Sequence, residues 1–530
     1  MNFYSASFIL FCAVVVLVYF LFPKKFRWCV LLTASYFFYF LNSQWLLLVH
    51  FGTAIFTWVI GLWINRINTQ GKEFLKDNPD LSREEKKAHK EKTKKNAQKV
   101  LWLGIIVDLG ILLFLKYWNF FIGQVNPLLA HFGLQAPNLG LLLPLGISFY
   151  TMQAMAYMID IFRGKIEPDR NPLKFMLFMS WFPQIVQGPI PRHKQLANQL
   201  YEGHDYDSMR LGYGFQLMLW GWFKKLVIAD RIGLVIPQIT NNPGTYHGFI
   251  VFFAFALGGI QLYADFSGGM DIASGFSQIL GIQLEKNFEQ PYFSRSIEEY
   301  WRRWHITLGA WMRDYVFYPL SLSKSFTKLG KNSRKIFGNN FGKKLPSFLA
   351  MFIVYFLVGF WHGADYKYIA YGVWNGIIIM SGILLEEFYE KVRQLLGFSE
   401  EMVCHRLFQM FRTFIIVSLA RYFSAALSFS DAIHFYNDTF TSFWDLSYFL
   451  DGTLQKLGMD TANWVLLLLT IIFLLLVDYL HEKNVHIREV IAVQHPAYRW
   501  FIYTVAVLSI LIFGIYGPSY NATAFIYEQF

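Results

Sequence analysis

Two histidines have sequence surroundings in which an imidazole could take part in chemistry. His362 follows a strongly apolar stretch and precedes Gly363 and Asp365, which places it at a helix end or inside a pocket. His305 lies in the segment EEYWRRWHITLGAWMRDYVFYPL, between a charged stretch and an amphipathic one. Imidazole changes its protonation near neutral pH, so such a histidine can remove a proton from a hydroxyl group, as acyl transfer requires. Composition alone supports a structural, hydrogen-bonding histidine about equally well.

A third candidate is the segment QLYADFSGGMDIASGF, which begins at Gln261. Its carboxylates, Asp265 and Asp271, stand among small and apolar residues, where an ionisable group is costly and is therefore a candidate for function. They could bind a cation or orient a histidine, or they could pair within a helix bundle whose glycines allow close packing. The segment lacks the lysine of a phosphate-binding loop and follows no strand.

Other reactive groups receive little support from the sequence. The two histidines are far apart in sequence, and Asp365 is the only candidate ligand close to either, so we predict no metal site. A Gly-x-Ser-x-Gly elbow is absent, and the spacing of Cys12, Cys29 and Cys404 suits neither zinc nor disulfides. We interpret the cysteines as packing residues.

The elements that position these residues are predicted to be membrane helices. Of the 530 residues, 55% are hydrophobic and only 16% are charged, and the apolar residues fall in runs near bilayer length. The net charge of +11 arises from Lys and Arg between these runs, so membrane topology explains it without nucleic acid. We predict an all-α, polytopic membrane protein with one membrane domain over residues 1–530.

The distribution of Lys and Arg predicts the orientation of the chain. Because positive loops stay in the cytoplasm, residues 65–99 and 323–344 are predicted inside and both termini outside, with roughly twelve crossings. We interpret 65–99 as a solvated helical loop, although its charges could bind a partner or anionic lipid. The chain is expected in the cytoplasmic membrane.

Two regions depart from simple crossings. Residues 175–190 are apolar but carry Pro183, Gly188 and Pro189, which predicts a broken or re-entrant helix covered by protein. Between 211 and 266 the charges of four residues interrupt the apolar pattern, and the topology stays open. These residues are Lys224, Lys225, Asp230 and Arg231.

Several long motifs together carry a resemblance to a known family. They are LPLGISFYTMQAMAYMIDIFRG (143–164), WFPQIVQGPIPR (181–192), QLYADFSGGMDIASG (261–275), NFEQPYFSRS (287–296), YWRRWHITLGAWMRDYVFYPL (300–320) and GFWHGADYKYIAYGVWNG (359–376). In this order they closely resemble the membrane-bound O-acyltransferase family, especially its branch that O-acetylates exported polysaccharides. The resemblance covers most of the chain.

The resemblance implies a fold and a chemistry. The family fold is a ring of tilted helices around a thin central layer with re-entrant segments, pierced by a tunnel. His362 would be the catalytic base toward a hydroxyl that attacks a thioester, and His305 would be the second histidine of the site. The donor would be acetyl-CoA or an acylated carrier protein on the cytoplasmic side, with no tightly bound cofactor.

Further site residues follow from the same resemblance. Candidates for binding the substrates are Gln261, Asp265, Arg303, Arg313 and Asp314. The arginines fit an alternative role as positive-inside anchors about equally well.

The family's branches differ in the acceptor. Some members acetylate exported polysaccharides with an extracytoplasmic transferase as partner, and similar proteins transfer D-alanine toward teichoic acid. The helices predicted beyond Leu385 favour the polysaccharide branch. The chain departs from this branch in one element. Many members of the branch carry a Phe-Arg-Ala element before an SxSDA stretch, whereas Ser424, Ala425 and Ala426 come shortly before SFSDA here. The missing arginine puts any role of that element in doubt.

The carboxy-terminal residues 521–530 are predicted to form an extracytoplasmic aromatic tail. The ending AFIYEQF is similar to the aromatic tails of these proteins, and the resemblance suggests Tyr527 as an acyl carrier. An interfacial aromatic anchor is the alternative. A transporter or scaffold is a rival from another class, but transporters often show internal repeats and none is evident.

Overall fold

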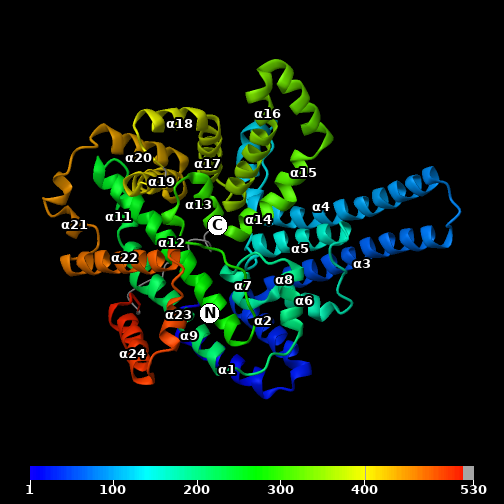
Figure 1. The fold of residues 1–530 in the computed structure, drawn as a ribbon, viewed down its shortest axis with the longest axis horizontal. Coiled ribbons are helices and arrows are strands. Elements are labelled where there is room, and N and C mark those ends of the chain that lie inside the picture. Colours follow the sequence, from blue (N-terminus) through cyan, green and yellow to red (C-terminus); the bar gives the residue numbers. More distant parts are fainter. Residues whose placement is uncertain (400–401, 517–530) are drawn as a thin grey trace. The chain divides into compact units, whose positions relative to one another are not determined.

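The computed structural model describes residues 1–399 and 402–516, which form two compact units. One unit comprises Met1–Phe215 with Ala273–Glu285, and the other comprises Gln216–Ile272 with the described residues from Lys286 onward. Across the described residues the regular elements are helices, and the only β-pairing is an isolated bridge between Phe288 and Trp304 (Figure 1). The prediction of an all-α protein is confirmed. A single domain over 1–530 stays a prediction.

The first unit is built from the amino-terminal helices. They are α1 (Ala6–Leu21), α2 (Arg27–Ser43), α3 (Leu47–Asp77), α4 (Arg83–Ala130), α5 (Ile147–Phe162), α6 (Pro172–Ser180), α7 (Phe182–Gln187), α8 (His193–Tyr201) and the start of α9 (Ser208–Trp222). Short 3-10 turns, Lys24–Phe26 and Gln44–Leu46, flank α2.

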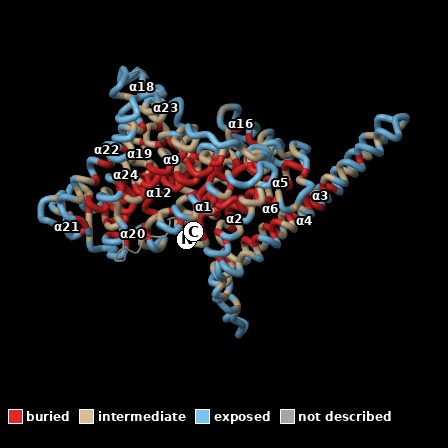
Figure 2. Tube along the Cα trace, turned by 90° about the horizontal axis from the view of Figure 1, so that it is seen from below, coloured by how far each residue is buried: buried red, intermediate tan, exposed pale blue. Residues whose placement is uncertain are grey.

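Helices α3 and α4 lie side by side as a hairpin, with a short turn at residues 78–82 (Figure 1). A capping box begins α4: the Ser82 hydroxyl accepts from the Glu85 amide, and the Glu85 carboxylate accepts from the Ser82 amide. The Phe74 ring stacks on the His89 imidazole with centroids 4.1 Å apart. The segment 65–99 is therefore helical, as predicted, and the hairpin tip is exposed (Figure 2).

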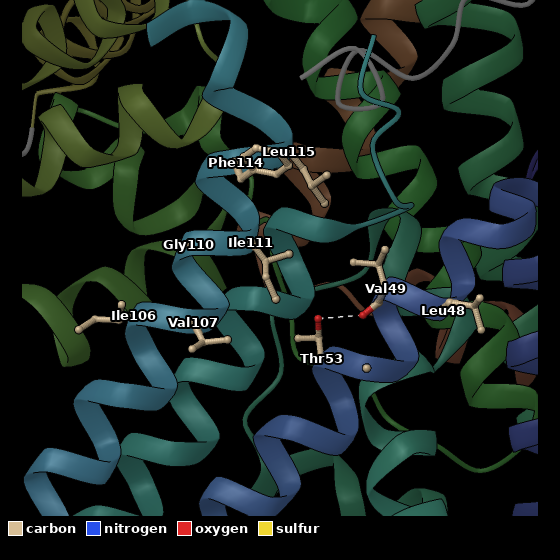
Figure 3. A pocket seen from close by; sticks show the side chains of 10 residues that line it. Leu48, Val49, Thr53, Ile106, Val107, Gly110, Ile111, Phe114 and Leu115 are labelled. Atoms are coloured by element: carbon tan, nitrogen blue, oxygen red, sulfur yellow. Dashed lines mark hydrogen bonds between the residues drawn. The ribbon is translucent and has the colours of Figure 1, made fainter. Parts of the chain in front are cut away.

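An open groove of about 630 Å³ lies between α3 and α4 (Figure 3). Apolar side chains and two glycines line it, together with Thr53, whose hydroxyl donates to the Val49 carbonyl at 2.9 Å. Both helices have stretches apolar enough to cross a bilayer. A groove of this composition is suited to contact with lipid chains rather than to chemistry.

The broken helix predicted at 175–190 is present. Trp181 has a non-helical backbone (φ −50°, ψ 107°) and separates α6 from α7. Side chains bind the backbone groups near the break: the Gln153 amide donates to the Phe178 carbonyl at 2.8 Å, and the Phe182 amide donates to the Ser35 hydroxyl at 3.3 Å. Such internal partners are what an interrupted helix requires inside a membrane.

The second unit holds the remaining helices. After a π-helical turn at Phe223–Ala229 they are α10 (Asp230–Ile232), α11 (Ile236–Thr240), α12 (Phe249–Ile279, which ends in the first unit), α13 (Ile297–Arg303), α14 (Ile306–Met312), a second π-helical turn at Arg313–Phe317, α15 (Tyr318–Ser321), α16 (Lys324–His362), α17 (Tyr366–Leu384), α18 (Glu386–Leu395), α19 (Val403–Ala425), α20 (Phe429–Thr441), α21 (Thr453–Lys456), α22 (Thr461–Glu482), α23 (Ile487–Ala492) and α24 (Pro496–Phe513). The region 211–266, left open by the sequence, is thus α9 to α12 with one π-helical turn.

Seven helical stretches in the described residues are long and apolar enough to cross a membrane, and eight if the bent pair α17 and α18 forms one span. One of these stretches, Lys24–Asp77, has 54 residues, more than twice the roughly 20 that one crossing needs. The polytopic membrane architecture is confirmed. The count of roughly twelve crossings stays a prediction.

Two glycines allow α16 and α17 to touch at the backbone beside His362. A Cβ on Gly359 would overlap the Tyr368 carbonyl oxygen, and a Cβ on Gly372 would overlap the Tyr355 carbonyl oxygen. Both glycines come from the motif around His362, so the helix that ends in this histidine is held tightly against the helix that follows it.

We expect Gly372→Ala to destabilise the protein by about 1–3 kcal/mol, because the added methyl group must push α16 away from α17. Gly382→Ala is the matched control: it lies on the same helix with open space around a Cβ, and alanine is the better helix former. Thermal unfolding of the purified variants in detergent measures the difference. Equal unfolding temperatures would contradict the close packing.

Candidate active site

His305 is held in place by a short backbone pairing. Backbone contacts bind residues 287–289 to residues 303–306. They are the Phe288–Trp304 bridge, the bond from the Glu289 amide to the Arg303 carbonyl (2.9 Å) and the bond from the Ile306 amide to the Asn287 carbonyl (3.0 Å). Between these bonds His305 adopts a left-handed conformation, φ 46° and ψ 51°. A residue in this region costs of order 1–3 kcal/mol, and such strain is concentrated at functional sites.

Asn287 also sets the tautomer of His305. Its side-chain oxygen accepts from the Thr307 amide at 3.0 Å and from the Thr307 hydroxyl at 2.9 Å, and it lies 3.2 Å from His305 Nδ1. Because an oxygen that faces these donors can only accept, Nδ1 carries the proton in the neutral ring. The lone pair of His305 is therefore on Nε2.

The structure brings His305 and His362 together around Trp361. The indole ring lies 6.0 Å from the His305 ring and 5.1 Å from the His362 ring, centroid to centroid. Both imidazoles are buried, at only 1% and 8% exposed. Phe266 covers His305 edge-on at 5.0 Å, and Tyr371 covers His362 edge-on at 5.8 Å. Two residues far apart in sequence thus form one buried, aromatic-walled pair.

Asp265 and Asp271 both pair with lysines. Asp265 lies 2.6 Å from Lys225, which also contacts Asp230 at 2.9 Å, and Asp271 lies 2.8 Å from Lys224. Lys225, Asp230 and Asp265 are each 3% exposed at the side chain. Both residues therefore follow the alternative prediction, in which the carboxylates pair within a helix bundle.

Both lysines lie on the π-helical turn Phe223–Ala229, which places them against α12. The approach is close because glycines meet there: a Cβ on Gly268 would lie 2.8 Å from the Gly221 carbonyl oxygen. This confirms that glycines of the QLYADFSGGMDIASGF segment permit close helix packing. Single-turn π-helical elements are frequent near functional sites.

The other predicted binding residues lie in defined contacts. Gln261 is buried on α12. Arg303 binds Glu482 through two bonds, at 2.6 and 3.1 Å, and Glu299 at 2.8 Å. Arg313 and Asp314 pair with each other at 2.9 Å on the second π-helical turn. A role of these residues in substrate binding stays a prediction, and Tyr527 lies outside the described residues.

Sequence reasoning missed several members of the site. Lys224 and Lys225 were visible only as charges that interrupt an apolar pattern. Asn287, Trp361 and Tyr371 belong to the quoted motifs, but nothing in their spacing indicates that they contact a histidine.

Comparison with known proteins gives the family of this chain. Residues 167–334 match the membrane-bound O-acyltransferase family, a stretch that includes His305. A probable alginate O-acetylase of Pseudomonas putida is 30% identical over 87% of this chain and 84% of its own length. The chain belongs to the membrane-bound O-acyltransferase family.

Other members of the membrane-bound O-acyltransferase family match less of their own length. A probable alginate O-acetylase of Pseudomonas aeruginosa is 33% identical over 69% of this chain and 63% of its own length. A peptidoglycan O-acetyltransferase of Helicobacter pylori is 32% identical over 68% of this chain and 64% of its own length. The chain thus spans slightly less than two thirds of these two relatives. A teichoic acid D-alanyltransferase of Bacillus subtilis is more distant, at 27% identity over 52% of this chain.

We expect Lys225→Met to destabilise the protein strongly, by about 3–5 kcal/mol, because it leaves two buried carboxylates without their shared cation. Lys24→Met is the matched control, because it breaks an ion pair with Asp205 that is exposed at both side chains. Its unfolding temperature should stay near that of the wild type. A Lys225→Met protein as stable as Lys24→Met would contradict the buried ion network.

Proposed function

We propose that this protein transfers an acyl group, with acetyl as the favoured case, from a cytoplasmic donor to an exported cell-envelope polysaccharide. The observation that carries the proposal is the buried pair of His305 and His362 against Trp361, in a member of this family. The relatives named for alginate and peptidoglycan O-acetylation support a polysaccharide acceptor. D-alanyl transfer to teichoic acid is the alternative, supported by a more distant relative.

His362 acts as the general base in this proposal. A lone pair of its neutral imidazole accepts the proton of the acceptor hydroxyl while the oxygen attacks the thioester carbonyl carbon. The tetrahedral intermediate then breaks its carbon–sulfur bond, and the imidazolium returns the proton to the leaving thiolate. The acyl group ends on oxygen, the donor leaves as a free thiol, and the imidazole is neutral again.

His305 orients and polarises the reacting groups. Since Asn287 accepts the Nδ1 proton, Nε2 is the nitrogen through which the neutral His305 ring can accept a proton or a hydrogen bond. The left-handed backbone and the bonds to 287–289 restrict the movement of this ring. A fixed ring is what a reaction needs when its rate depends on near-attack geometry.

The donor in this proposal is acetyl-CoA or an acylated carrier protein, bound on the cytoplasmic side with the help of Arg303, Arg313 and neighbouring polar residues. The protein lies in the cytoplasmic membrane with both termini outside, as its Lys and Arg distribution predicts. A bulky glycan cannot enter a membrane tunnel, so an extracytoplasmic acyltransferase is expected as a partner, in addition to the surrounding lipid.

We expect His362→Ala to lower glycan O-acylation by about 10²–10⁴-fold, because a general base contributes that much to the rate. His305→Ala should also lower it, by a smaller factor. The control is His247→Ala, which removes a partly exposed histidine of the same unit that pairs with Asp438. Mass spectrometry of envelope glycans gives the acyl content, and immunoblots give the membrane level. Full acylation with His362→Ala at normal membrane levels would refute the assignment.

Tyr527→Phe tests the proposed acyl carrier. The substitution keeps the aromatic ring and most of its interfacial affinity but removes the phenol oxygen that would hold the acyl group. If Tyr527 carries the acyl group, the variant should lose acylation to the level of His362→Ala. An anchor alone would leave the acyl content near that of the wild type, and this result would exclude the carrier role while leaving His362 catalytic.

A further inference from the structure

Arg303, two residues before His305, is bound through both its side chain and its main chain. Both oxygens of the Glu482 carboxylate accept from its guanidinium, at 2.6 and 3.1 Å, and Glu299 accepts a third bond at 2.8 Å. The Arg303 carbonyl oxygen accepts from the Glu289 amide at 2.9 Å, within the backbone pairing beside the histidine. Because only one residue separates Arg303 from His305, the place of the arginine determines where the backbone of the histidine begins.

The carboxylate of Glu482 reaches this arginine from a helix that is distant in sequence. Glu482 is the last residue of α22, 179 positions after Arg303, and the stretch 167–334 that matches the family does not contain it. One turn earlier on α22, Asp478 accepts from the Tyr263 hydroxyl of α12 at 2.9 Å, and both of these residues are only 4% exposed. This buried bond holds the end of α22 against α12, so Glu482 binds Arg303 from a fixed position.

The tyrosine that α22 binds also packs against the backbone bridge beside His305. The Tyr263 ring lies edge-on to Phe288 at 5.9 Å and tilted to Trp304 at 6.2 Å, centroid to centroid. These two residues form the isolated β-bridge. The end of α22 therefore contacts the pairing in two ways, through the Arg303 guanidinium and through the Tyr263 phenol.

We propose that Glu482 is a positioning residue that holds the backbone of His305 in its left-handed conformation through Arg303. A left-handed residue other than glycine persists only when its surroundings over-determine that conformation. A planar guanidinium bound by both oxygens of one carboxylate has a fixed direction as well as a favourable energy. The Glu482 side chain is 31% exposed, so this ion pair contributes little to the stability of the fold. Its loss is therefore expected to change the geometry at His305 more than the folding of the protein.

The reactivity of His305 toward diethyl pyrocarbonate tests the proposal without any acyl donor. The full-length protein in detergent is treated briefly, and peptide mass spectrometry gives the carbethoxylation rate of each histidine. The buried His50 of the first unit is the internal reference, because a general loosening of the fold would raise its rate as well. We expect Glu482→Gln to raise the ratio of the His305 rate to the His50 rate by at least about threefold, since a neutral amide offers only one acceptor to the guanidinium.

The variant Arg303→Gln tests whether Glu482 acts through the arginine. Arg303→Gln alone should raise the ratio at least as much as Glu482→Gln, and the double variant should show no further rise, because both changes break one contact. If Glu482→Gln does not fold, Glu482→Asp replaces it, with a smaller rise expected, because the shortened side chain cannot reach both nitrogens.

Glu390→Gln is the matched control. This glutamate pairs with Arg393 at 3.7 Å within α18 of the same unit, and both side chains are partly or fully exposed. The substitution removes one carboxylate from a Glu–Arg pair without touching the pairing beside His305. The ratio of the His305 rate to the His50 rate should stay at the wild-type value.

Two results would overturn the proposal. They are a wild-type ratio in whichever variant at position 482 folds, and a double variant whose ratio is the product of the two single effects. The catalytic consequence rests on the proposed function, whose failure gives a different result: full acylation with His362→Ala would leave these labelling ratios as they are. A loss of glycan acylation in Glu482→Gln, at an unfolding temperature near that of the wild type, links the positioning to the reaction.

Discussion

The charge on Lys225 constrains how the helices of the second unit pack. A lysine buried among membrane helices is tolerated only when carboxylates surround it, and Asp230 and Asp265 do so at 2.9 and 2.6 Å. This shared cation fixes α12 to the π-helical turn before it. Helix α12 in turn supplies the ring of Phe266 to His305. The paired charges therefore hold in place the helix that packs against His305.

The sequence motifs hold different parts of the site in place around α12. Residues 287–289 hold His305 in a left-handed conformation that an isolated peptide would avoid. Gly359 and Gly372 allow α16, which ends in His362, to pack closely against α17. Precision at the site thus comes from backbone contacts rather than from the reactive side chains. A small displacement of reacting groups can cost a large factor in rate, which explains why so many residues around the two imidazoles serve only to hold them.

The sequence predicts the helical class and the broken segment at 175–190 because hydrophobic run length and Pro or Gly interruptions act locally. It also predicts the two histidines, since an imidazole beside apolar membrane segments is rare and costly. The sequence does not predict that Asp265 pairs with Lys225, because the π-helical turn that orients the lysine has no sequence signal. A single sequence does not show which distant segments contact each other until the fold is known.

The burial of both imidazoles limits how the proton can move in the proposed reaction. Two positive rings buried against the same indole ring would repel each other strongly, so at most one of them carries the extra proton at a time. If His362 takes the hydroxyl proton, His305 must stay neutral, with its proton held on Nδ1 by Asn287. The imidazolium at His362 is then unstable unless a negative charge forms beside it at once. The tetrahedral oxyanion and the departing thiolate supply that charge, so proton removal, attack and departure of the sulfur are coupled by the cost of an unpaired charge in this site.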